Sequence, residues 1–568
     1  MAFWHNLQHN SGLHADPVWR RFVTRWSLVS LLLIGLVCHL SRDFFQFDEY
    51  YSVTEFVSYK LGKTPEKALC WEYHSEIRPW LQPAIYYVAA RGLTAIGVDN
   101  PFTLAEVFRA MSALCALAAL VSLMLTANVF FEDDQRRPMV VLLAVLFILP
   151  YLAARTSSES LSGDFFSLGF SALMLGSRAV DRQRRIVPAI AAIVSGICFG
   201  LAFECRYQIA FAVLGVVGWI YCFSGESRWR TIGKLALLSC GVFLAVGAGA
   251  CADCWGYGHW VLTPWNYFHE NILMGVANRF GTSPVWWYLA GMNSSPVVPM
   301  TLLWTIAMLA TWIRHPKHIV SWATIAFCLA HSLVGHKEAR FLFPIAQVST
   351  FAFILGLAPR TGELRQAKWL RWLWEQRRSR TAKYLYALNF VALAAMGFTT
   401  RQPGIWLQKV IYDRYQHGCH AYILGKDTKS LYTNVGFDMY FYRPPGFQLI
   451  RLDGYDELDA LVRAGPKTFL LITDFVHTEP EQELIVPQAE LVYRSYPSWI
   501  ENYNYFNWLQ RSRHYSLYVV NLSRGQETGV RGQGTTNAAT TRRTSEVRAA
   551  TAASCAKLGL PASLFPDP

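Results

Sequence analysis

Twelve long apolar segments follow one another through the first 400 residues of this chain, and they constrain its fold more than any other feature. Each approaches the length at which a helix rising about 1.5 Å per residue crosses the hydrocarbon core of a bilayer. They cover residues 26–40, 83–98, 104–129, 139–154, 166–180, 187–203, 208–223, 234–252, 297–313, 319–334, 341–358 and 384–400. This pattern predicts a mainly α-helical, polytopic membrane protein with roughly 10 to 13 transmembrane helices, several of them short or tilted.

The composition agrees with a membrane protein, because 53% of the residues are apolar and only 16% are charged. The net charge of +13 does not indicate a nucleic-acid partner, since the basic residues gather in short loops between the apolar segments. Such loops stay on the cytosolic face. They lie at 181–185, 228–230, 314–317 and 360–383. Residues 44–82, 253–295, 336–341 and everything after 400 then belong to the opposite face, and membrane lipids are the expected surroundings.

One stretch of the chain conflicts with this assignment of faces. Four apolar segments lie between residues 83 and 180, where the assignment requires an odd number. We therefore expect either 139–154 or 166–180 to be re-entrant, or the two to form one broken span.

Four zones follow from the shifts in composition. Residues 1–25 form a cytosolic arm, and residues 26–400 form the membrane body with outer loops at 44–82 and 253–295. Residues 401–523 alternate strand-like runs with Gly, Pro and Asp turns, which predicts a small mixed α/β luminal domain. Residues 524–568 are rich in Thr, Ala, Gly, Ser and Arg, and we expect them to be disordered. Glycosylation sequons at 293–295 and 521–523 fall on the predicted outer face.

Cysteine usage gives no sign of a metal centre. Twelve cysteines are scattered along the chain, and only Cys251 and Cys254 form a CxxC pair. A structural zinc site needs four ligands, and no second pair is evident. The chain also lacks a P-loop, a dinucleotide glycine fingerprint and a DxD motif. We predict neither a metal nor a cofactor, and a disulfide on the outer face stays open.

The first outer loop places acidic residues directly after a membrane helix. Asp48 and Glu49 are adjacent, and Glu72 and Arg78 follow them. A hydroxyl that acts as a nucleophile must lose its proton, and a positioned carboxylate can accept it. Alternatively, Asp48 and Glu49 only stabilise the start of the next helix, where acidic residues are favourable. The residues alone leave both interpretations open.

Residues 336–341 (HKEARF) concentrate four ionisable side chains between two apolar segments. A lone cation there would extend its charge into the headgroups, but a cluster is costly near a bilayer unless it serves chemistry. His336, Lys337 and Arg340 are suited to bind an anionic group such as a phosphate and to stabilise a departing anion. Glu338 is better suited to orient these cations than to act as a base.

The stretch from His336 to Pro344 resembles the HKExRFxxP motif of glycosyltransferase family 22, the polytopic mannosyltransferases that use dolichyl-phosphate-mannose. The first outer loop is similar to the family's F-x-P-D-E, T-W-E and I/L-R-S elements. The matching positions are Asp48, Glu49, Trp71, Glu72, Ile77 and Arg78, whereas Phe47, Cys70 and Pro79 depart from the pattern.

Three weaker resemblances lie further along the chain. Glu159 ends a segment, 155–159, that resembles the family's R-T-L-S-N-S-L-E element, and Arg206 begins an R-x-Q element. Asp253 opens a stretch similar to the family's D…YG…N-F…N…G…WYL pattern. Its aromatic residues either stack on sugars or form an interfacial belt.

The resemblance implies an integral-membrane, inverting hexosyltransferase of the GT-C class. It implies one-step transfer of mannose from a β-linked polyprenyl-phosphate-mannose donor to a lipid-linked glycan acceptor, at the luminal face of the endoplasmic reticulum. The closest branches are the N-glycan α-1,2-mannosyltransferases and the glycosylphosphatidylinositol (GPI) mannosyltransferase III type, which we favour and which adds the third, α-1,2-linked mannose of the GPI precursor. The implied site consists of Asp48 as base, Glu49 beside it, His336, Lys337, Arg340 and Arg206 on the donor phosphate, and Glu338, Glu72, Arg78, Glu159 and Asp253 in support.

Two alternatives remain open at this point. A bacterial relative, in an inner membrane with a periplasmic site, would decorate an envelope glycan from an undecaprenyl-type donor, and the departures at 78–83 and 155–159 suit such a divergent enzyme. A transporter or lipid flippase would instead use intramembrane charges to line a pathway. Transporters of that kind show repeated halves with paired broken helices, and this sequence shows no internal repeat.

Overall fold

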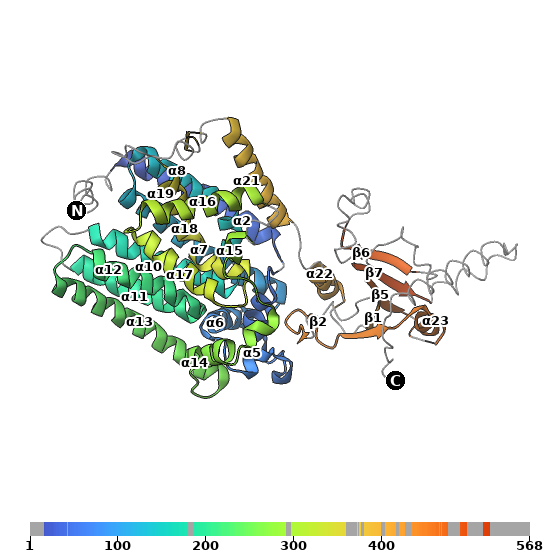
Figure 1. Cartoon of the computed structure of the whole chain (residues 1–568). Coiled ribbons are helices and arrows are strands. Elements are labelled where there is room, and N and C mark those ends of the chain that lie inside the picture. Colours follow the sequence, from blue (N-terminus) through green and yellow to red (C-terminus); the bar gives the residue numbers. More distant parts are fainter. Residues whose placement is uncertain are drawn as a thin grey trace. The chain divides into compact units, whose positions relative to one another are not determined.

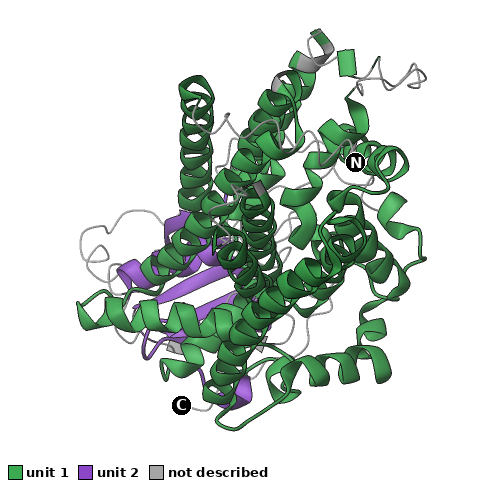
Figure 2. Cartoon of the chain, turned by 90° about the vertical axis from the view of Figure 1, so that its left-hand side faces the viewer, with its two compact units in different colours: residues 1–62, 69–399 green, residues 63–68, 400–568 purple. Residues whose placement is uncertain are grey.

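The computed structural model describes most of the chain. The described residues are 16–42, 44–178, 186–290, 297–358, 372, 374–375, 380–398, 404–415, 420–425, 433–434, 437–464, 466, 468–474, 489–496 and 515–522. The chain divides into two compact units, residues 1–62 with 69–399 and residues 63–68 with 400–568 (Figure 2). The start of the N-terminal arm, the 181–185 loop, most of the 360–383 linker and the tail predicted to be disordered lie outside the described residues, as do one sequon entirely and the last residue of the other.

The first unit is helical, and each of the twelve apolar segments is largely helical where it is described (Figure 1). This confirms the mainly α-helical prediction. The longer helices are α2 (Pro17–Leu40), α6 (Leu81–Ala95), α7 (Pro101–Phe130), α8 (Asp133–Val145), α10 (Ser158–Arg178), α11 (Ile186–Cys205), α12 (Ala210–Phe223), α13 (Arg228–Tyr257), α16 (Val298–Arg314), α17 (Ile319–Leu333) and α21 (Arg380–Phe398). Short helices complete the unit: α3 (Phe47–Glu49), α4 (Glu55–Lys60), α5 (Trp71–His74), α9 (Ile148–Ala153), α14 (Thr263–Phe268), α15 (Trp287–Ala290), α18 (Ala346–Ser349) and α19 (Phe351–Leu357).

Helix length separates the apolar helices into two groups. Among the described residues, α2, α7, α11 and α13 are long and apolar enough to cross a bilayer, and residues 339–357 would add a fifth span if their bent helices are taken together. Two further apolar helices, Tyr207–Phe223 and Ile319–Leu333, are shorter. The larger number of 10 to 13 spans depends on such short helices also crossing, and it stays a prediction.

The segment 139–154 is broken between α8 and α9, and a distant side chain satisfies the break. The Asn389 amide on α21 donates to the carbonyl of Val145 (2.6 Å), and its oxygen accepts from the Phe147 amide (2.8 Å). Backbone groups that leave a helix inside an apolar body need such a partner. The break lies in one of the two segments where the sequence predicted an irregularity.

The segment 341–358 is not one straight helix. It begins as a 3₁₀ turn (Ala339–Ile345), continues as α18, and bends by 69° into α19. Pro344 has no amide hydrogen to continue an α-helix. Gly163 on α10 allows the turn to approach, because a Cβ there would lie 3.0 Å from the Pro344 carbonyl oxygen. The irregular turn carries Arg340.

The second unit contains a mixed five-stranded sheet, which confirms the predicted small α/β region. Strand order is β4-β1-β5-β7-β6, with β4, β1 and β5 parallel and β7 antiparallel to both neighbours. Its elements are α22 (Gly404–Arg414), β1 (His420–Gly425), β4 (Gln448–Leu452), α23 (Tyr455–Ala464), β5 (Thr468–Asp474), β6 (Ala489–Arg494) and β7 (Tyr515–Asn521), and a separate pair is formed by β2 (Thr433–Asn434) and β3 (Phe437–Asp438).

Alternation along the strands gives this sheet two apolar faces. Ala421 and Ile423 of β1 pack in a core with Leu407 and Ile411 of α22. The intervening strand residues, such as Leu424, pack in a second core with α23. Because successive strand residues point to opposite faces, each helix covers one side of the sheet.

Candidate active site

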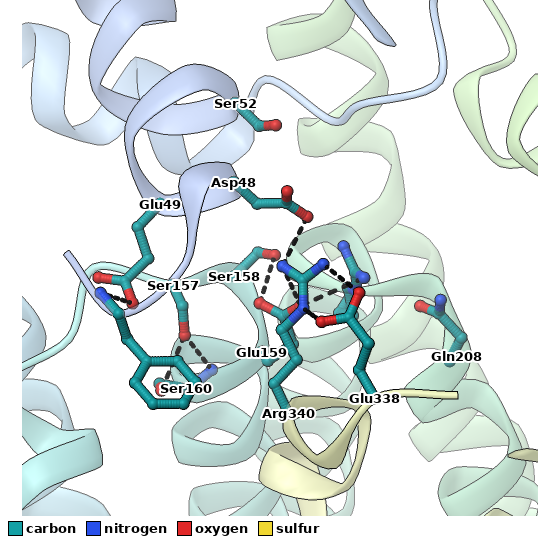
Figure 3. Close-up of polar contacts among 12 residues, drawn as sticks. Asp48, Glu49, Ser52, Ser157, Ser158, Glu159, Ser160, Gln208, Glu338 and Arg340 are labelled. Atoms are coloured by element: carbon teal, nitrogen blue, oxygen red, sulfur yellow. Dashed lines mark hydrogen bonds and ion pairs between the residues drawn. The ribbon is translucent and has the colours of Figure 1, made fainter. Parts of the chain in front are cut away.

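Asp48 and Glu49 are neighbours in sequence, but their carboxylates face different surroundings. Both lie in α3, where consecutive residues are turned by about 100° around the helix axis. The Asp48 carboxylate points toward a cluster of arginines, whereas Glu49 is buried and accepts a hydrogen bond from the Phe45 amide at 3.1 Å (Figure 3). The structure therefore brings Asp48, but not Glu49, to the arginine cluster.

Two guanidinium groups meet at one oxygen of Asp48. Its Oδ2 atom lies 2.7 Å from Nη2 of Arg78 and 2.8 Å from Nη1 of Arg340. Arg78 is itself held by Glu72, through Nε at 2.8 Å and Nη2 at 2.6 Å, and the Ser52 hydroxyl donates to the same carboxylate at 2.8 Å. The first outer loop is thus folded around Arg78.

Arg340 connects that loop to the rest of the site. Its Nε and Nη2 atoms donate to Glu338 at 2.8 and 2.9 Å, a bidentate geometry that fixes the guanidinium plane. Its Nη1 atom lies 3.7 Å from Glu159 at the start of α10, and Glu159 lies 3.2 Å from Nη2 of Arg206 at the end of α11. Four segments distant in sequence therefore converge on one charged cluster.

The remaining residues of the 336–341 block serve this convergence differently. His336 contacts Glu338 through Nε2 (3.1 Å) and the Gly281 carbonyl through Nδ1 (3.0 Å). Both partners are acceptors, so both ring nitrogens carry a hydrogen when the two contacts form together. Lys337 donates to the carbonyls of Ser283 (2.9 Å) and Val334, which ties the second outer loop to the end of α17.

Asp253 lies in a separate buried site. Its Oδ1 atom accepts from the Trp80 amide at 2.7 Å, and Oδ2 accepts from the Thr263 hydroxyl, which in turn accepts from the hydroxyl of Tyr207 at 2.7 Å. These partners are neutral. Asp253 therefore joins α13 to the start of α6 and to the second outer loop.

Electrostatics keep Asp48 and Glu338 ionised. Burial alone would raise the pKa of Asp48, but the guanidinium groups of Arg340, Arg78 and Arg206 outweigh it and hold that pKa well below its usual range. Burial also opposes ionisation of Glu338, yet Arg340 and the hydrogen bonds from Arg340 and His336 lower its pKa. In this state Asp48 is a carboxylate at neutral pH, and a weak base.

Two further residues join the site that sequence reasoning did not assign to it. Ser52 supports Glu72, and nothing in its sequence context marks it. Gln208 donates from Nε2 to the Tyr267 hydroxyl, and the R-x-Q element that begins at Arg206 was a signal for it. Within the described parts of the chain, no group of three or more His, Cys, Asp or Glu side chains is arranged to hold a metal ion.

Comparison with solved structures identifies the fold. The crystal structure of ArnT from Cupriavidus metallidurans bound to undecaprenyl phosphate superposes with a TM-score of 0.51, and the alignment covers 87% of this chain and 97% of that one. The sequences are only 12% identical, so this likeness concerns the fold. It confirms the predicted GT-C class and, with the apolar helices, an integral membrane protein.

Comparison with curated sequences identifies relatives and then the family. GPI mannosyltransferase 3 of Yarrowia lipolytica is 24% identical over 58% of this chain and 61% of its own length, and that of Trypanosoma brucei brucei is 26% identical over 59% and 66%. GPI alpha-1,2-mannosyltransferase 3 of Mus musculus is 24% identical over 56% of each chain. The chain thus spans less than two thirds of the length of these relatives. Residues 26–451, three quarters of the sequence, match the Alg9-like mannosyltransferase family, and the chain belongs to that family.

Proposed function

We propose that this protein transfers mannose from a polyprenyl-phosphate-mannose, a dolichyl lipid in a eukaryotic cell, to a GPI precursor as its third, α-1,2-linked residue. The reaction takes place at the luminal face of the endoplasmic reticulum. The observation that carries this proposal is the convergence of Asp48 with Arg340, Glu159 and Arg206 at one charged cluster. Family membership and the GPI mannosyltransferase 3 relatives support the choice of sugar and acceptor.

The donor phosphate is assigned to the side of the cluster that contains Arg206 and Arg340. Arg206 is buried, and its Nη1 atom has no hydrogen-bond partner among the described residues. A buried hydrogen-bond donor without a partner costs about 1–3 kcal/mol, and the cost is larger when the group is charged. A phosphate oxygen would remove that cost, and guanidinium groups bind phosphate through paired hydrogen bonds.

The chemical step follows from the position of Asp48 relative to these cations. The acceptor hydroxyl attacks the anomeric carbon of mannose, and Asp48 takes the hydroxyl proton as the new carbon–oxygen bond forms. The bond between the anomeric carbon and the phosphate oxygen breaks, and its electron pair leaves with the phosphate. Arg340 and Arg206 stabilise the charge that develops there. Attack opposite to the leaving group converts the β-linked donor into an α-mannoside.

Donor binding also raises the basicity of Asp48, which is weak in the donor-free protein. In the donor-free structure Arg340 spends one nitrogen, Nη1, on Asp48. A phosphate competes for that nitrogen, because the other two nitrogens of Arg340 are already engaged by Glu338. When Arg340 turns to the phosphate, Asp48 keeps only Arg78, and its pKa rises toward a value useful for a general base. The base thus becomes competent once the donor is in place.

The supporting residues keep this exchange local. Glu72 accepts hydrogen bonds from two nitrogens of Arg78, so Arg78 stays beside Asp48 when Arg340 moves to the phosphate. Glu338, which also contacts His336, holds the guanidinium group of Arg340. Lys337, bound to backbone carbonyls, is assigned to loop anchoring near the phosphate, with its charge available to the donor through a short movement.

The test is a transfer assay with purified protein in detergent. Radiolabelled polyprenyl-phosphate-mannose is supplied with a GPI precursor that carries two mannoses, and products are separated and digested with a linkage-specific α-mannosidase. We expect one α-1,2-linked mannose to be added by the wild type and none by Asp48→Asn. Nucleotide-linked mannose should not replace the lipid donor. A correctly folded wild-type protein that accepts an undecaprenyl-linked sugar and an envelope glycan instead would overturn the GPI assignment.

A further inference from the structure

Gln208 lies two residues after the proposed phosphate ligand Arg206, in the 3₁₀ turn Tyr207–Ile209 that follows α11. In Figure 3 its amide points toward the side of the cluster formed by Glu338. The turn is short and follows a helix end, so Gln208 and Arg206 are carried by the same rigid corner. A ligand of Arg206 would therefore lie next to the turn that carries Gln208.

One end of the Gln208 amide is paired and the other is not. Nε2 donates to the Tyr267 hydroxyl, while Oε1 is buried and has no hydrogen-bond partner among the described residues. If the amide were rotated by 180°, the nitrogen would take the unpaired position, so Tyr267 satisfies only one end in either orientation. Leaving the other end buried without a partner is unfavourable.

The surroundings show what kind of group belongs at that unpaired end. Tyr267 lies within electrostatic range of Arg78, the guanidinium that holds Asp48. Gln208 thus follows the proposed phosphate ligand Arg206 by two residues and binds Tyr267, which lies within electrostatic range of Arg78. In the proposed reaction the group that occupies the space between the phosphate and the base is the sugar. A sugar hydroxyl can both donate and accept, and so fits either end of an amide.

An unpaired amide oxygen does not by itself mark a ligand site, because another buried glutamine of this unit has one. Gln347 also has an unpaired buried Oε1, but its Nε2 donates to Asp164 on α10, beyond Glu159 in the direction away from the cluster. Gln208 differs because it follows the proposed phosphate ligand Arg206 by two residues and binds Tyr267, which lies within electrostatic range of Arg78.

Resting on the proposed function, we propose that Gln208 binds one hydroxyl of the donor hexose and contributes to the choice of sugar, with Tyr267 holding its amide in orientation. The substrate class is a polyprenyl-phosphate hexose whose phosphate contacts Arg206 and whose ring hydroxyl contacts Gln208. Losing a hydrogen bond to a buried group in such a site reduces transfer about tenfold to 100-fold.

The experiment is a cycle that combines one variant with altered donors. Transfer is measured for wild type and Gln208→Ala with polyprenyl-phosphate-mannose and with its 2-, 3-, 4- and 6-deoxy analogues. Gln347→Ala is the matched control, because it also removes a buried amide with one unpaired end. Tyr267→Phe keeps the ring but releases the amide, and should weaken discrimination among donors less than Gln208→Ala does.

With wild type we expect one deoxy analogue to give a kcat/KM about tenfold to 100-fold below that of the mannose donor. With Gln208→Ala the same analogue and the mannose donor should give equal kcat/KM values. In Gln347→Ala every deoxy penalty should persist unchanged. The proposal is overturned if all deoxy penalties persist in Gln208→Ala, since the residue would then have only a structural role. If wild type transfers no mannose, the proposed function fails, and the same cycle on donor-binding affinity still decides the role of Gln208.

Discussion

Asp48 and Asp253 are both acidic residues of the first unit that the sequence assigned to the site, yet their surroundings differ. Asp48 meets two guanidinium groups at one oxygen, and its side chain is 25% exposed. Asp253 is buried and contacts a backbone amide and a hydroxyl. The first set of partners can be exchanged for those of an anionic substrate, whereas the second set belongs to the fold.

This difference separates residues that react from residues that hold the scaffold. A carboxylate bound by arginines is poised to share those arginines with a phosphate. A carboxylate that accepts from a buried amide and a buried hydroxyl does not exchange them readily, because each would become a buried unsatisfied donor. Substitutions that treat the two acids alike should therefore have opposite effects on activity and stability.

The strongest contrast is expected from Asp48→Asn. The amide keeps the shape of the side chain but cannot accept the acceptor's proton, so kcat should fall about 1,000-fold. The melting temperature should fall modestly, because the ion pairs of Asp48 are weakened while Arg78 retains Glu72, Arg340 retains Glu338, and the asparagine oxygen can still accept a hydrogen bond. Rates from single-turnover transfer and a thermal melt in the same detergent give both values. A variant with near-normal kcat would remove Asp48 as the base.

Arg340→Lys is expected to have the next largest effect. Lysine keeps the charge but cannot hold Glu338 through two nitrogens while a third nitrogen reaches Asp48 or, in its place, a phosphate. We expect kcat/KM for the donor to fall about 100-fold. Lys409→Arg, an exchange at an exposed ion pair of the second unit, is the matched control and should be silent. Equal, small effects would indicate that Arg340 acts only as a point charge.

Much of the fold could be predicted because the physical demand is local. Apolar runs in a bilayer must satisfy their own backbone groups, so length and hydropathy located the helices. The breaks were harder. The one between α8 and α9 depends on Asn389, more than 240 residues away, and the 69° bend after Ser349 depends on packing that lets Pro344 approach Gly163. Such contacts leave no periodic signal in the sequence.

The site was predicted mainly through the resemblance to a family. That resemblance marked Asp48, Arg78 and Arg340, which the structure brings together, and also Glu49, which it turns away. The direction of Glu49 depends on where α3 begins, which motif spacing does not reveal. Lys337 is engaged by the carbonyls of Ser283 and Val334, which are invisible to side-chain patterns. The catalytic roles of these residues stay predictions.

The pH dependence of transfer would test whether Asp48 changes partners on donor binding. The pKa of Asp48 in the folded, donor-free protein lies below its unfolded value of about 3.9. Its ion pairs therefore stabilise the protein above that unfolded value, and this stability is lost as the pH falls through the lower folded value. For activity, kcat/KM reports the free enzyme and kcat reports the donor complex. We expect the acid limb of kcat at the higher pH, and coincident limbs would contradict the exchange of Arg340.

Asp253→Asn should show the opposite balance from Asp48→Asn. The asparagine oxygen can still accept from the Trp80 amide and its nitrogen can donate to Thr263, but the Thr263 hydroxyl then loses the acceptor for its own hydrogen. We expect the free energy of unfolding to fall by about 1 kcal/mol. The kcat value should stay within a few-fold of the wild type. A large loss of kcat in a protein of unchanged stability would place Asp253 in the reaction and end the contrast between the two acids.

The smallest expected effect on activity tests whether the Asp253 site acts on the cluster at all. In Gly256→Ala the added Cβ would lie 2.1 Å from Cγ of the buried Trp80, whereas in Gly247→Ala, on the same helix, no atom lies within 4 Å. Crowding of this kind costs about 1–3 kcal/mol of stability, and the control should melt like the wild type. Trp80 follows Arg78 by two residues, so a displaced Trp80 that moved Arg78 would lower kcat as well. We expect transfer within a few-fold of normal, because Glu72 and Asp48 hold Arg78 independently of Trp80. A larger loss of transfer would mean that the packing around Asp253 and Trp80 positions the charged cluster at Asp48.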